Sequence, residues 1–412
     1  MPMMKDSGIN DVGLVPNTWI TPKIGYYFSF RSGDSLTSLD IDDTTGDYKV
    51  YGANGIRGYY SKCNTHGKHI LLGRVGALCG NVHIIDGENW VTEHALILSR
   101  KKKCVEEYCG YLFKTLNLGQ YSKSSAQPVI SVETISQLKF VIPPLSEQKK
   151  IAGFLDSKCA EIDALSADIQ KEIETLEEYK RSVIAEAVTK GLDPNAEMKD
   201  SGISWIGQIP KHWTVYRIAD LYQDRNERGN DELPLLTVSI NSGVSDKELG
   251  KDEAERNFIR SEDKTKYKRV YPGDLTYNMM RAWQGSMGAV RVDGMVSPAY
   301  VVAKPTGTCE IDSRFIEALL RSPLGIEEMN RYSYGIMDFR KRLYWPQFRI
   351  IKVALPGIEE QRKIADYIDT TNRKIDDIVS AKVKQLSTLE EYKKSLIYEY
   401  VTGKKEVPSN NA

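Results

Sequence analysis

The sequence has no long apolar run and no sign of a secretory leader. None of its segments approaches the ~18–20 consecutive apolar residues that a membrane-spanning helix needs, and its first residues, MPMMKDSGIN, lack the apolar core of a signal peptide. Six cysteines occur without a CxxC pair: Cys63, Cys79, Cys104, Cys109, Cys159 and Cys309. Free thiols are therefore expected in place of a disulfide or zinc framework, and we expect a cytoplasmic protein.

The chain also lacks an excess of either charge. It has 56 basic and 56 acidic residues among its 412, and its apolar fraction of 41% is that of an ordinary globular protein. A protein that binds DNA tightly by itself usually carries a basic excess, because the neutralisation of phosphates supplies much of the binding energy. Neutrality argues against a lone DNA binder and is compatible with one that binds DNA together with partner subunits. The length predicts two or more domains.

Motifs of DNA-modifying enzymes are missing as well. A methyltransferase acting on amino groups needs an Asn/Asp-Pro-Pro-aromatic motif, whereas the only Pro-Pro pair here is followed by Leu145. No GxxxxGK loop is present, which argues against an ATP-driven motor. Nuclease-like Glu-x-Lys triplets lack a suitably placed partner acid. His66 and His69 lack a third and fourth ligand at a recognisable spacing, so a solvated turn is expected there. The chain is predicted to recognise a partner, without catalysing a reaction.

Two blocks of the sequence occur twice. Residues 4–9, MKDSGI, return unchanged as residues 198–203, and the match continues to a tryptophan in each copy. A second block begins with PLSEQKKI at residues 144–151 and with GIEEQRKI at residues 357–364, and both copies later contain LEEYK. The stretches between the blocks share little sequence. Matching ends with divergent middles indicate one scaffold that carries two different recognition modules. The alternative is an old duplication without a division of function.

The second block has the pattern of a long helix. In the first copy, apolar residues recur every seven positions: Leu155, Ile162, Ile169, Leu176 and Val183. The second copy repeats the series with one polar break: Ile368, Ile375, Lys382, Leu389 and Leu396. This period predicts helices that pack lengthwise, and a helix of about 40 residues spans roughly 60 Å. We predict that the two helices pack antiparallel about a pseudo-two-fold axis. Two separate helices, each lying on its own domain, are the alternative.

The divergent stretches, at about 20–143 and 214–355, are each predicted to form an α+β domain. Both contain short strand-like runs broken by glycine, with helical patterns near residues 105–116 and 313–320. Basic, amide and aromatic residues gather in their loops, and Arg, Lys, Asn and Gln side chains can form paired hydrogen bonds with base edges. For each residue taken singly, a solvated surface position is the alternative. The candidate DNA-contact residues are Tyr51, Asn54, Arg57, Arg74, Lys123, Gln127, Lys266, Lys268, Asn278, Arg281, Gln284, Arg340 and Lys341.

The repeated motifs resemble those of a known family. Residues 199–213, KDSGISWIGQIPKHW, and residues 143–151, PPLSEQKKI, resemble the motifs of type I restriction–modification specificity subunits. Residues 51–60, 73–82 and 90–95 look like parts of a first target-recognition domain of that family. The first entry motif departs from the pattern, with NDVG where the second copy has SWIG, and the second helix motif lacks the double proline.

The resemblance implies an α+β protein in which two target-recognition domains are separated by two long antiparallel coiled-coil helices, with a pseudo-two-fold internal repeat. The chain is divided accordingly: a first target-recognition domain at 1–145, a central long helix at 146–192, a second target-recognition domain at 193–356, a C-terminal long helix at 357–403 and a flexible tail at 404–412.

By the same resemblance, each domain reads one half of an interrupted site in double-stranded DNA. The helices set the spacing and dock two modification subunits, which transfer a methyl group from S-adenosylmethionine to adenine. Restriction subunits add ATP- and Mg-dependent translocation and cleavage, so no cofactor or metal is expected in this chain. A specificity protein with built-in methylation or cleavage is the alternative, and a coiled-coil scaffold without a DNA role is a third reading.

Overall fold

The computed structural model describes residues 3–76, 79–122, 128–230, 232–246, 266–335 and 340–408. The chain forms two compact units: residues 1–170 with 383–412, and residues 171–382. Each long helix contributes one part to each unit, so the domain boundaries predicted above remain a prediction. Across the described residues, helices long and apolar enough to cross a membrane are absent.

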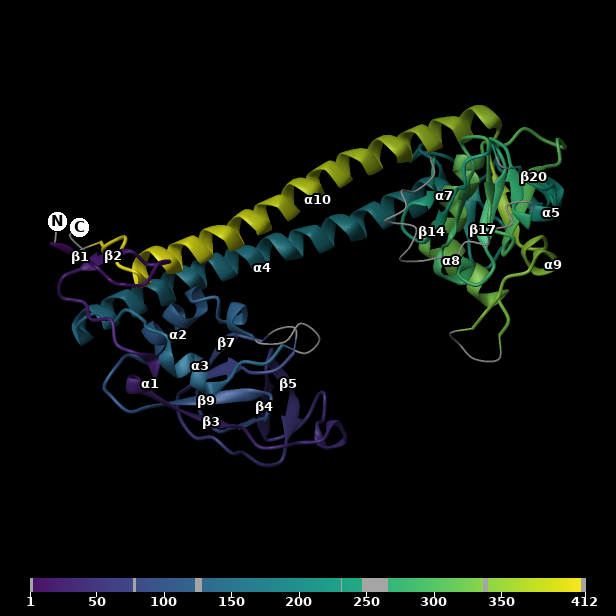
Figure 1. The fold of residues 1–412 in the computed structure, drawn as a ribbon. Coiled ribbons are helices and arrows are strands. Elements are labelled where there is room, and N and C mark those ends of the chain that lie inside the picture. The colour runs from purple at the N-terminus through teal and green to yellow at the C-terminus, as the bar shows by residue number, and fades with distance from the viewer. Residues whose placement is uncertain are drawn as a thin grey trace. The chain divides into compact units, whose positions relative to one another are not determined.

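Two sheets and a helix form the body of the first unit (Figure 1). The antiparallel four-stranded sheet has the order β3 (Phe28–Ser32), β9 (Ala95–Arg100), β6 (His69–Gly73), β7 (Val82–Ile85). The three-stranded sheet has the order β5 (Gly55–Tyr60), β4 (Tyr48–Gly52), β8 (Asn89–Val91), with β8 parallel to β4. Helix α2 (Glu106–Thr115) packs on β6 and β7. This is the α+β arrangement that the sequence predicts.

Aromatic side chains fill the core of the first unit. Phe28 meets Phe113 edge-on at a centroid distance of 5.3 Å, and Phe140 packs beside both rings. Burial of each such side chain contributes about 1.5–3 kcal/mol. The Tyr108 hydroxyl, on α2, donates to the carbonyl of Val401 at 3.0 Å. This hydrogen bond attaches the sheet-and-helix body of the first unit to the end of a long helix.

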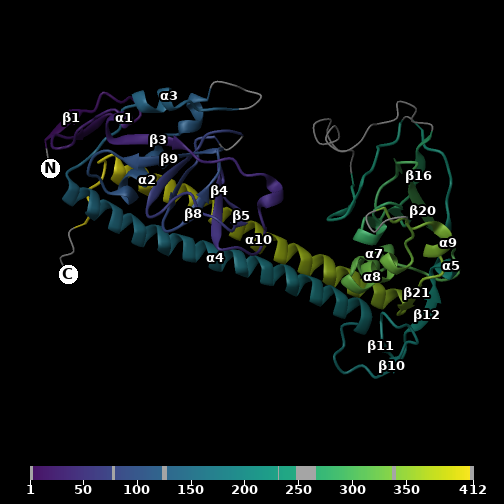
Figure 2. The ribbon, with the colours of Figure 1, turned by 90° about the horizontal axis from the view of Figure 1, so that it is seen from below.

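Among the described residues, the second unit contains a four-stranded sheet, four two-stranded sheets, of which the β10–β11 hairpin is described below, and the neighbouring helices α7 and α8 (Figure 2). The four-stranded sheet has the order β13 (Tyr222–Asp224), β20 (Tyr300–Pro305), β17 (Leu275–Asn278), β18 (Met287–Ala289). The pairs are β12 (Thr214–Arg217) with β21 (Lys352–Leu355), β14 (Val238–Ser239) with β15 (Gly243–Val244), and β16 (Lys268–Val270) with β19 (Gly294–Val296). The helices are α7 (Ser313–Arg321) and α8 (Pro323–Arg331).

Two long helices, α4 (Leu145–Lys190) and α10 (Ile358–Val401), pack antiparallel within each unit. In the first unit Lys393 pairs with Asp163 at 2.6 Å. In the second unit Lys180 pairs with Asp376 at 2.6 Å, and Lys382 pairs with Glu172. As the residue numbers rise along α4, the numbers of the paired residues on α10 fall. This order confirms the predicted antiparallel pairing. Lys382, the polar break in the apolar series, forms an ion pair across the helices.

A glutamine in each copy of the repeated motif joins the α+β body of its unit to a long helix. Gln148 accepts from the Val105 N–H at 2.8 Å and donates to the Pro143 carbonyl at 2.8 Å. Gln361 accepts from the Asp312 N–H at 3.0 Å and donates to the Pro356 carbonyl at 2.9 Å. Both glutamines are 2% exposed. Each amide satisfies two backbone groups, and a buried group left unpaired costs about 1–3 kcal/mol.

The entry motifs form matching hairpins. Strands β1 (Met4–Asp6) and β2 (Leu14–Pro16) pair in the same register as β10 (Met198–Asp200) and β11 (Gln208–Pro210). The degenerate residues of the first copy therefore leave the hairpin unchanged. Trp19 packs close to Gly403, and Trp213 packs close to Gly191. Each hairpin thus lies at the C-terminal end of the other copy's long helix, in the same unit.

Candidate functional site

A two-residue turn joins β4 to β5 in the first unit and carries the exposed side chain of Asn54. Gly55, which ends this turn, has φ +103°, and a Cβ there would lie 3.3 Å from Cε1 of His83 on β7, so the close approach requires glycine. Asn54 Oδ1 accepts from Asn81 Nδ2 at 3.0 Å. Since the Asn81 carbonyl also accepts from the Gly73 N–H at 2.8 Å, the turn is tied to the loop that follows β6.

Two predicted arginines lie near this turn along the chain. Arg57 is exposed on β5. Its side chain passes close to Gly52, because a Cβ added at Gly52 would lie 2.6 Å from the Cδ of Arg57. Arg74 follows β6, with its N–H bonded to the His94 carbonyl at 2.8 Å. The Arg74 Nε is buried and has no hydrogen-bond partner within the described part of the chain. Because Asn81 bridges Asn54 to the loop after β6, the structure brings Asn54 to the segment that carries Arg74.

The other first-unit candidates do not join this cluster. Tyr51 is half-buried on β4 and packs on the small core cluster that contains Leu71 and Val91, so burial raises the pKa of its hydroxyl. Its predicted contact with DNA stays a prediction. Lys123 and Gln127 lie outside the described residues.

His83 adds an imidazole to the turn that sequence reasoning passed over. Burial, and after it the charge of Lys114, lowers the pKa of His83. The signal was weak because a single histidine in a strand-like run is ordinary.

In the second unit, a turn after β17 presents two of the candidates. Asn278 is 6% exposed, and its Oδ1 accepts from the Met280 N–H at 3.0 Å, so this amide shapes the turn. The short 3-10 helix Ala282–Gln284 follows. Arg281 and Gln284 are exposed at its two ends.

The remaining candidates occupy three different settings. Lys268, on β16, donates to the Tyr300 carbonyl at 2.9 Å, and burial lowers its pKa. Lys266 and Arg340 are exposed, and Lys341 donates to Asn330 Oδ1 at 3.0 Å. Lys268 and Lys341 thus already serve internal contacts.

An arginine–tyrosine stack in the second unit was not foreseen. The guanidinium groups of Arg225 and Arg269 lie 4.5 and 4.6 Å from the centroid of the Tyr271 ring. Arg225 also donates to the carboxylate of Asp274 at 3.2 Å. Asp274 is 1% exposed, and burial raises its pKa despite the opposing charge of Arg225. Arg225 precedes Arg269, Tyr271 and Asp274 by 44 or more positions along the chain, so no local pattern predicts the stack.

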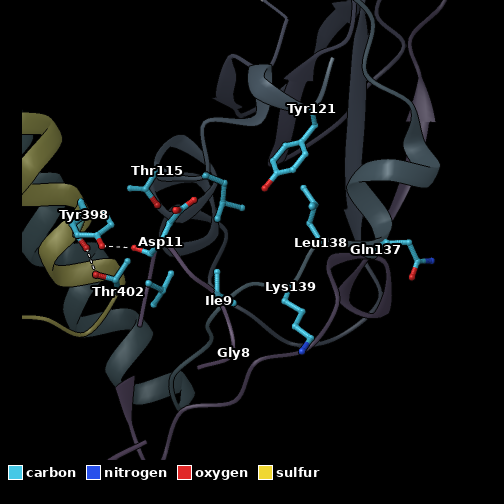
Figure 3. A pocket seen from close by; sticks show the side chains of 12 residues that line it. Gly8, Ile9, Asp11, Thr115, Tyr121, Gln137, Leu138, Lys139, Tyr398 and Thr402 are labelled. Atoms are coloured by element: carbon cyan, nitrogen blue, oxygen red, sulfur yellow. Dashed lines mark hydrogen bonds between the residues drawn. The ribbon is translucent and has the colours of Figure 1, made fainter. Parts of the chain in front are cut away.

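A pocket in the first unit lies between the first residues, the segment after α2 and the end of α10 (Figure 3). The Tyr398 hydroxyl donates to the Asp11 carbonyl at 2.5 Å at its rim. Its lining has a single carboxylate, from Asp11, and no histidine or cysteine among the described residues. This set does not suit acid–base or nucleophilic catalysis. None of the candidate DNA contacts lines it, within the part of the chain that is described.

Comparison with known proteins points to one family. The model of the "Type I restriction modification DNA specificity domain" matches residues 16–175. The chain is 35% identical over 136 residues to the EcoprrI specificity subunit of a type I restriction enzyme from Escherichia coli, covering 32% of this chain and about a third (34%) of that protein. It is 24% identical over 433 aligned positions to the MjaVIII specificity subunit from Methanocaldococcus jannaschii, covering 96% of this chain and 95% of that one.

Among solved structures, a chain from a study of complex assembly and conformational transition of the type I R-M system is similar in fold. The TM-score is 0.64 at 13% sequence identity, with 94% of this chain and 98% of that chain covered. At this identity the likeness concerns the fold alone. The family model, the two relatives and the duplicated helix motif agree: the chain is similar over nearly its whole length to type I restriction–modification specificity subunits, and its residues 16–175 match the DNA specificity domain of that family.

Proposed function

We propose that this chain selects the DNA site for a type I restriction–modification complex, with each recognition domain reading one half of a bipartite site. The observation that carries the proposal is that the same joint occurs twice, a joint being the contact of a buried glutamine at the start of a long helix with the neighbouring domain. Gln148 and Gln361 hold two different α+β domains in the same way on two equivalent helices. A scaffold that keeps its joints and varies its loops suits a protein that presents two separate recognition surfaces.

Exposed turns supply the proposed base contacts. Asn54 and Arg57 in the first unit, and Arg281 and Gln284 in the second, are exposed on or beside tight turns. Asn and Gln pair with adenine and Arg pairs with guanine in the major groove, each pair contributing about 1–3 kcal/mol of discrimination. Arg74, whose Nε has no hydrogen-bond partner among the described residues, is proposed as a further contact.

The long helices are proposed to set the gap between the two half-sites. Seven residues added to α4, and seven added to α10 at the paired position, keep the apolar series and lengthen each helix by about 10 Å. The preferred gap should then grow by about 3 base pairs. An unchanged gap would contradict this role.

Two matched apolar surfaces on the helices are proposed to dock two modification subunits. In the first unit Leu165 and Tyr392 are 48% and 54% exposed, and in the second Ile378 and Tyr179 are 46% and 56% exposed. The register set by Lys393 with Asp163, and by Lys180 with Asp376, places each aliphatic residue across from its tyrosine. Because each unit presents the same pair, two copies of one partner would fit. S-adenosylmethionine, ATP and Mg²⁺ are expected to bind the partner subunits.

The test compares the purified chain alone with the chain plus its cognate modification subunit. Weak binding of a DNA duplex by the chain alone, strengthened by the subunit, is expected in fluorescence anisotropy. Tyr179→Ala with Tyr392→Ala should weaken subunit association. Leu39→Ala, at an exposed apolar residue of the first unit that lies outside the two long helices, should leave it unchanged. Equal DNA binding with and without the subunit would contradict the proposal. Methylation or cleavage by the chain alone would favour the alternative of a built-in activity.

A further inference from the structure

Three side chains that can ligate a metal ion meet at one end of the three-stranded sheet in the first unit. Cys63 and His66 lie in the loop between β5 and β6, and Glu88 lies in the turn before β8. The Cys63 Sγ, one ring nitrogen of His66 and one carboxylate oxygen of Glu88 all lie within 4.8 Å of one another. His66 Nδ1 is 3.2 Å from Glu88 Oε1. Sequence reasoning considered His66 with His69 and found no further ligand, because Glu88 lies 22 residues away.

The backbone on both sides of this cluster is held in place. Asn64 and Thr65, between the two ligands of the loop, donate their N–H groups to the Asn89 carbonyl at 3.0 Å each. The Asn64 side chain donates to the Val91 carbonyl at 2.8 Å and accepts from the Val91 N–H at 2.7 Å. These bonds fix the loop against the segment that follows Glu88. Such support for the ligand-bearing backbone is what a preorganised metal site requires.

We propose that Cys63, His66 and Glu88 bind one zinc ion, with the fourth position open to solvent. A thiolate, an imidazole and a carboxylate together favour Zn²⁺ over Mg²⁺ or Ca²⁺, which prefer oxygen ligands alone. Tetrahedral zinc with bonds of about 2.0–2.3 Å needs its ligand atoms about 3.3–3.8 Å apart, so the side chains have to close by about 1 Å. His66 and Glu88 are 69% and 53% exposed in their side chains and are free to make that adjustment.

Bound zinc would carry no net charge with its ligands, since a thiolate and a carboxylate balance its two positive charges. The ion would link the β5–β6 loop to the turn before β8. His69 stays outside the site, because its Nε2 contacts the His66 carbonyl at 3.0 Å. The role of the metal is therefore to hold one end of this sheet, and the proposal does not depend on DNA recognition.

The test uses the untagged full chain, reduced with a phosphine and stripped of metal. Titration with zinc against a chromophoric chelator should show one equivalent taken up by the protein. Cobalt(II) in place of zinc should give the near-ultraviolet charge-transfer absorption of a thiolate ligand. Cys63→Ser should abolish that absorption, whereas Cys309→Ser, another partly buried cysteine, should retain it. Glu88→Gln should keep the absorption and weaken zinc binding by at least about tenfold.

Circular dichroism of each variant checks that the fold is retained, and Glu88→Gln keeps the test decisive if Cys63→Ser fails to fold. Zinc should also raise the thermal midpoint of the parent chain, and a chelator should reverse the rise. No uptake of zinc in competition with the chelator would overturn the proposal. So would zinc binding by Cys63→Ser, or by Glu88→Gln, that equals that of the parent chain.

Discussion

The joint between recognition domain and long helix is built alike in both halves, whereas the loops that carry the candidate DNA contacts differ. Gln148 and Gln361 bond the same two kinds of backbone group in the two units. In the first unit the exposed turn belongs to the β4–β5 hairpin, and its Asn54 accepts a hydrogen bond from Asn81. In the second, a buried Asn278 shapes a turn that leads into a 3-10 helix.

The difference shows where the chain is free to vary. A buried glutamine that satisfies two backbone groups is costly to replace, because each unpaired group costs about 1–3 kcal/mol. Exposed residues such as Arg57 on β5 and Gln284 at the end of the 3-10 helix usually change stability by less than about 0.5 kcal/mol when replaced. One half can therefore acquire a new recognition surface while its joint to the helix stays the same.

The largest expected effect concerns the joints. Gln148→Leu leaves the Val105 N–H and the Pro143 carbonyl unpaired and should lower the local free energy of unfolding by about 2–4 kcal/mol. Hydrogen exchange should become faster in α2 and the first turn of α4. Gln361→Leu should have the matching effect on α7 and α10.

The exposed Gln223 supplies the control for both joint variants, since Gln223→Leu should leave exchange unchanged. If amide hydrogen exchange in the Gln148→Leu and Gln361→Leu variants is as slow as in the parent chain, the two glutamines do not fasten the domains to the long helices.

A smaller effect is expected at the arginine–tyrosine stack, which is particular to the second half. Arg225→Met leaves the Asp274 carboxylate buried without its main positive partner and should destabilise the second unit by about 2–3 kcal/mol. Denaturant unfolding followed by a probe in that unit measures the loss. Arg225→Met combined with Asp274→Asn should recover part of it, and no recovery would show that the charge pair is not the cause.

Single substitutions of the exposed arginines Arg57 and Arg281 should show whether each half of the chain reads its own half-site. Arg57→Ala should weaken binding of the reconstituted complex to its cognate site by about 1–3 kcal/mol and relax base preference in one half-site. Arg281→Ala should do so in the other half-site. Competition binding with duplexes altered in one half at a time gives the answer. If either substitution alone relaxed the base preference in both half-sites, the two halves of the chain would not read separate half-sites.

The smallest effect is a pH dependence confined to the first half. Burial keeps the pKa of His83 below its ordinary value of about 6.5, so the folded unit favours the neutral imidazole. The neutral His83 side chain makes its full contribution to stability at pH values above the pKa of this histidine in the unfolded chain. That contribution is lost as the pH falls through the lower pKa of the histidine in the folded chain. Lowering the pH from about 7 to 5 should speed amide exchange in the β4–β5 turn. His83→Gln should reduce this dependence, whereas His94→Gln, at a histidine whose side chain is 45% exposed, should not.

The long helices could be predicted from the sequence because their information is local. The seven-residue series from Leu155 to Val183, bounded by prolines and Gly191, needs no knowledge of distant contacts. The helix near 313–320 was likewise predicted and forms α7 (Ser313–Arg321). The end of strand β18 (Met287–Ala289) was less predictable, because there the Ala289 N–H donates at 3.1 Å to the carboxylate of Glu317, which lies 28 residues away.

The candidate site was less predictable because its contacts are long-range. Asn54 meets Asn81 across 27 residues, and Arg225 meets Asp274 across 49. Tyr51 lies in a glycine- and aromatic-rich segment that suggested an exposed loop, yet its side chain packs on the core cluster that contains Leu71 and Val91. Which side of a strand is buried depends on pairing partners that the local sequence does not specify.

The separation of two recognition surfaces on one repeated scaffold is tested most directly by exchange of one surface. Residues 20–143 are replaced by the corresponding stretch of a different relative, and methylated adenines are mapped after reconstitution with the modification subunit. One half of the recognised site should change, while the other half and the gap between them stay as they were. Altered preference in both halves, or an altered gap, would contradict the proposed independence of the two domains.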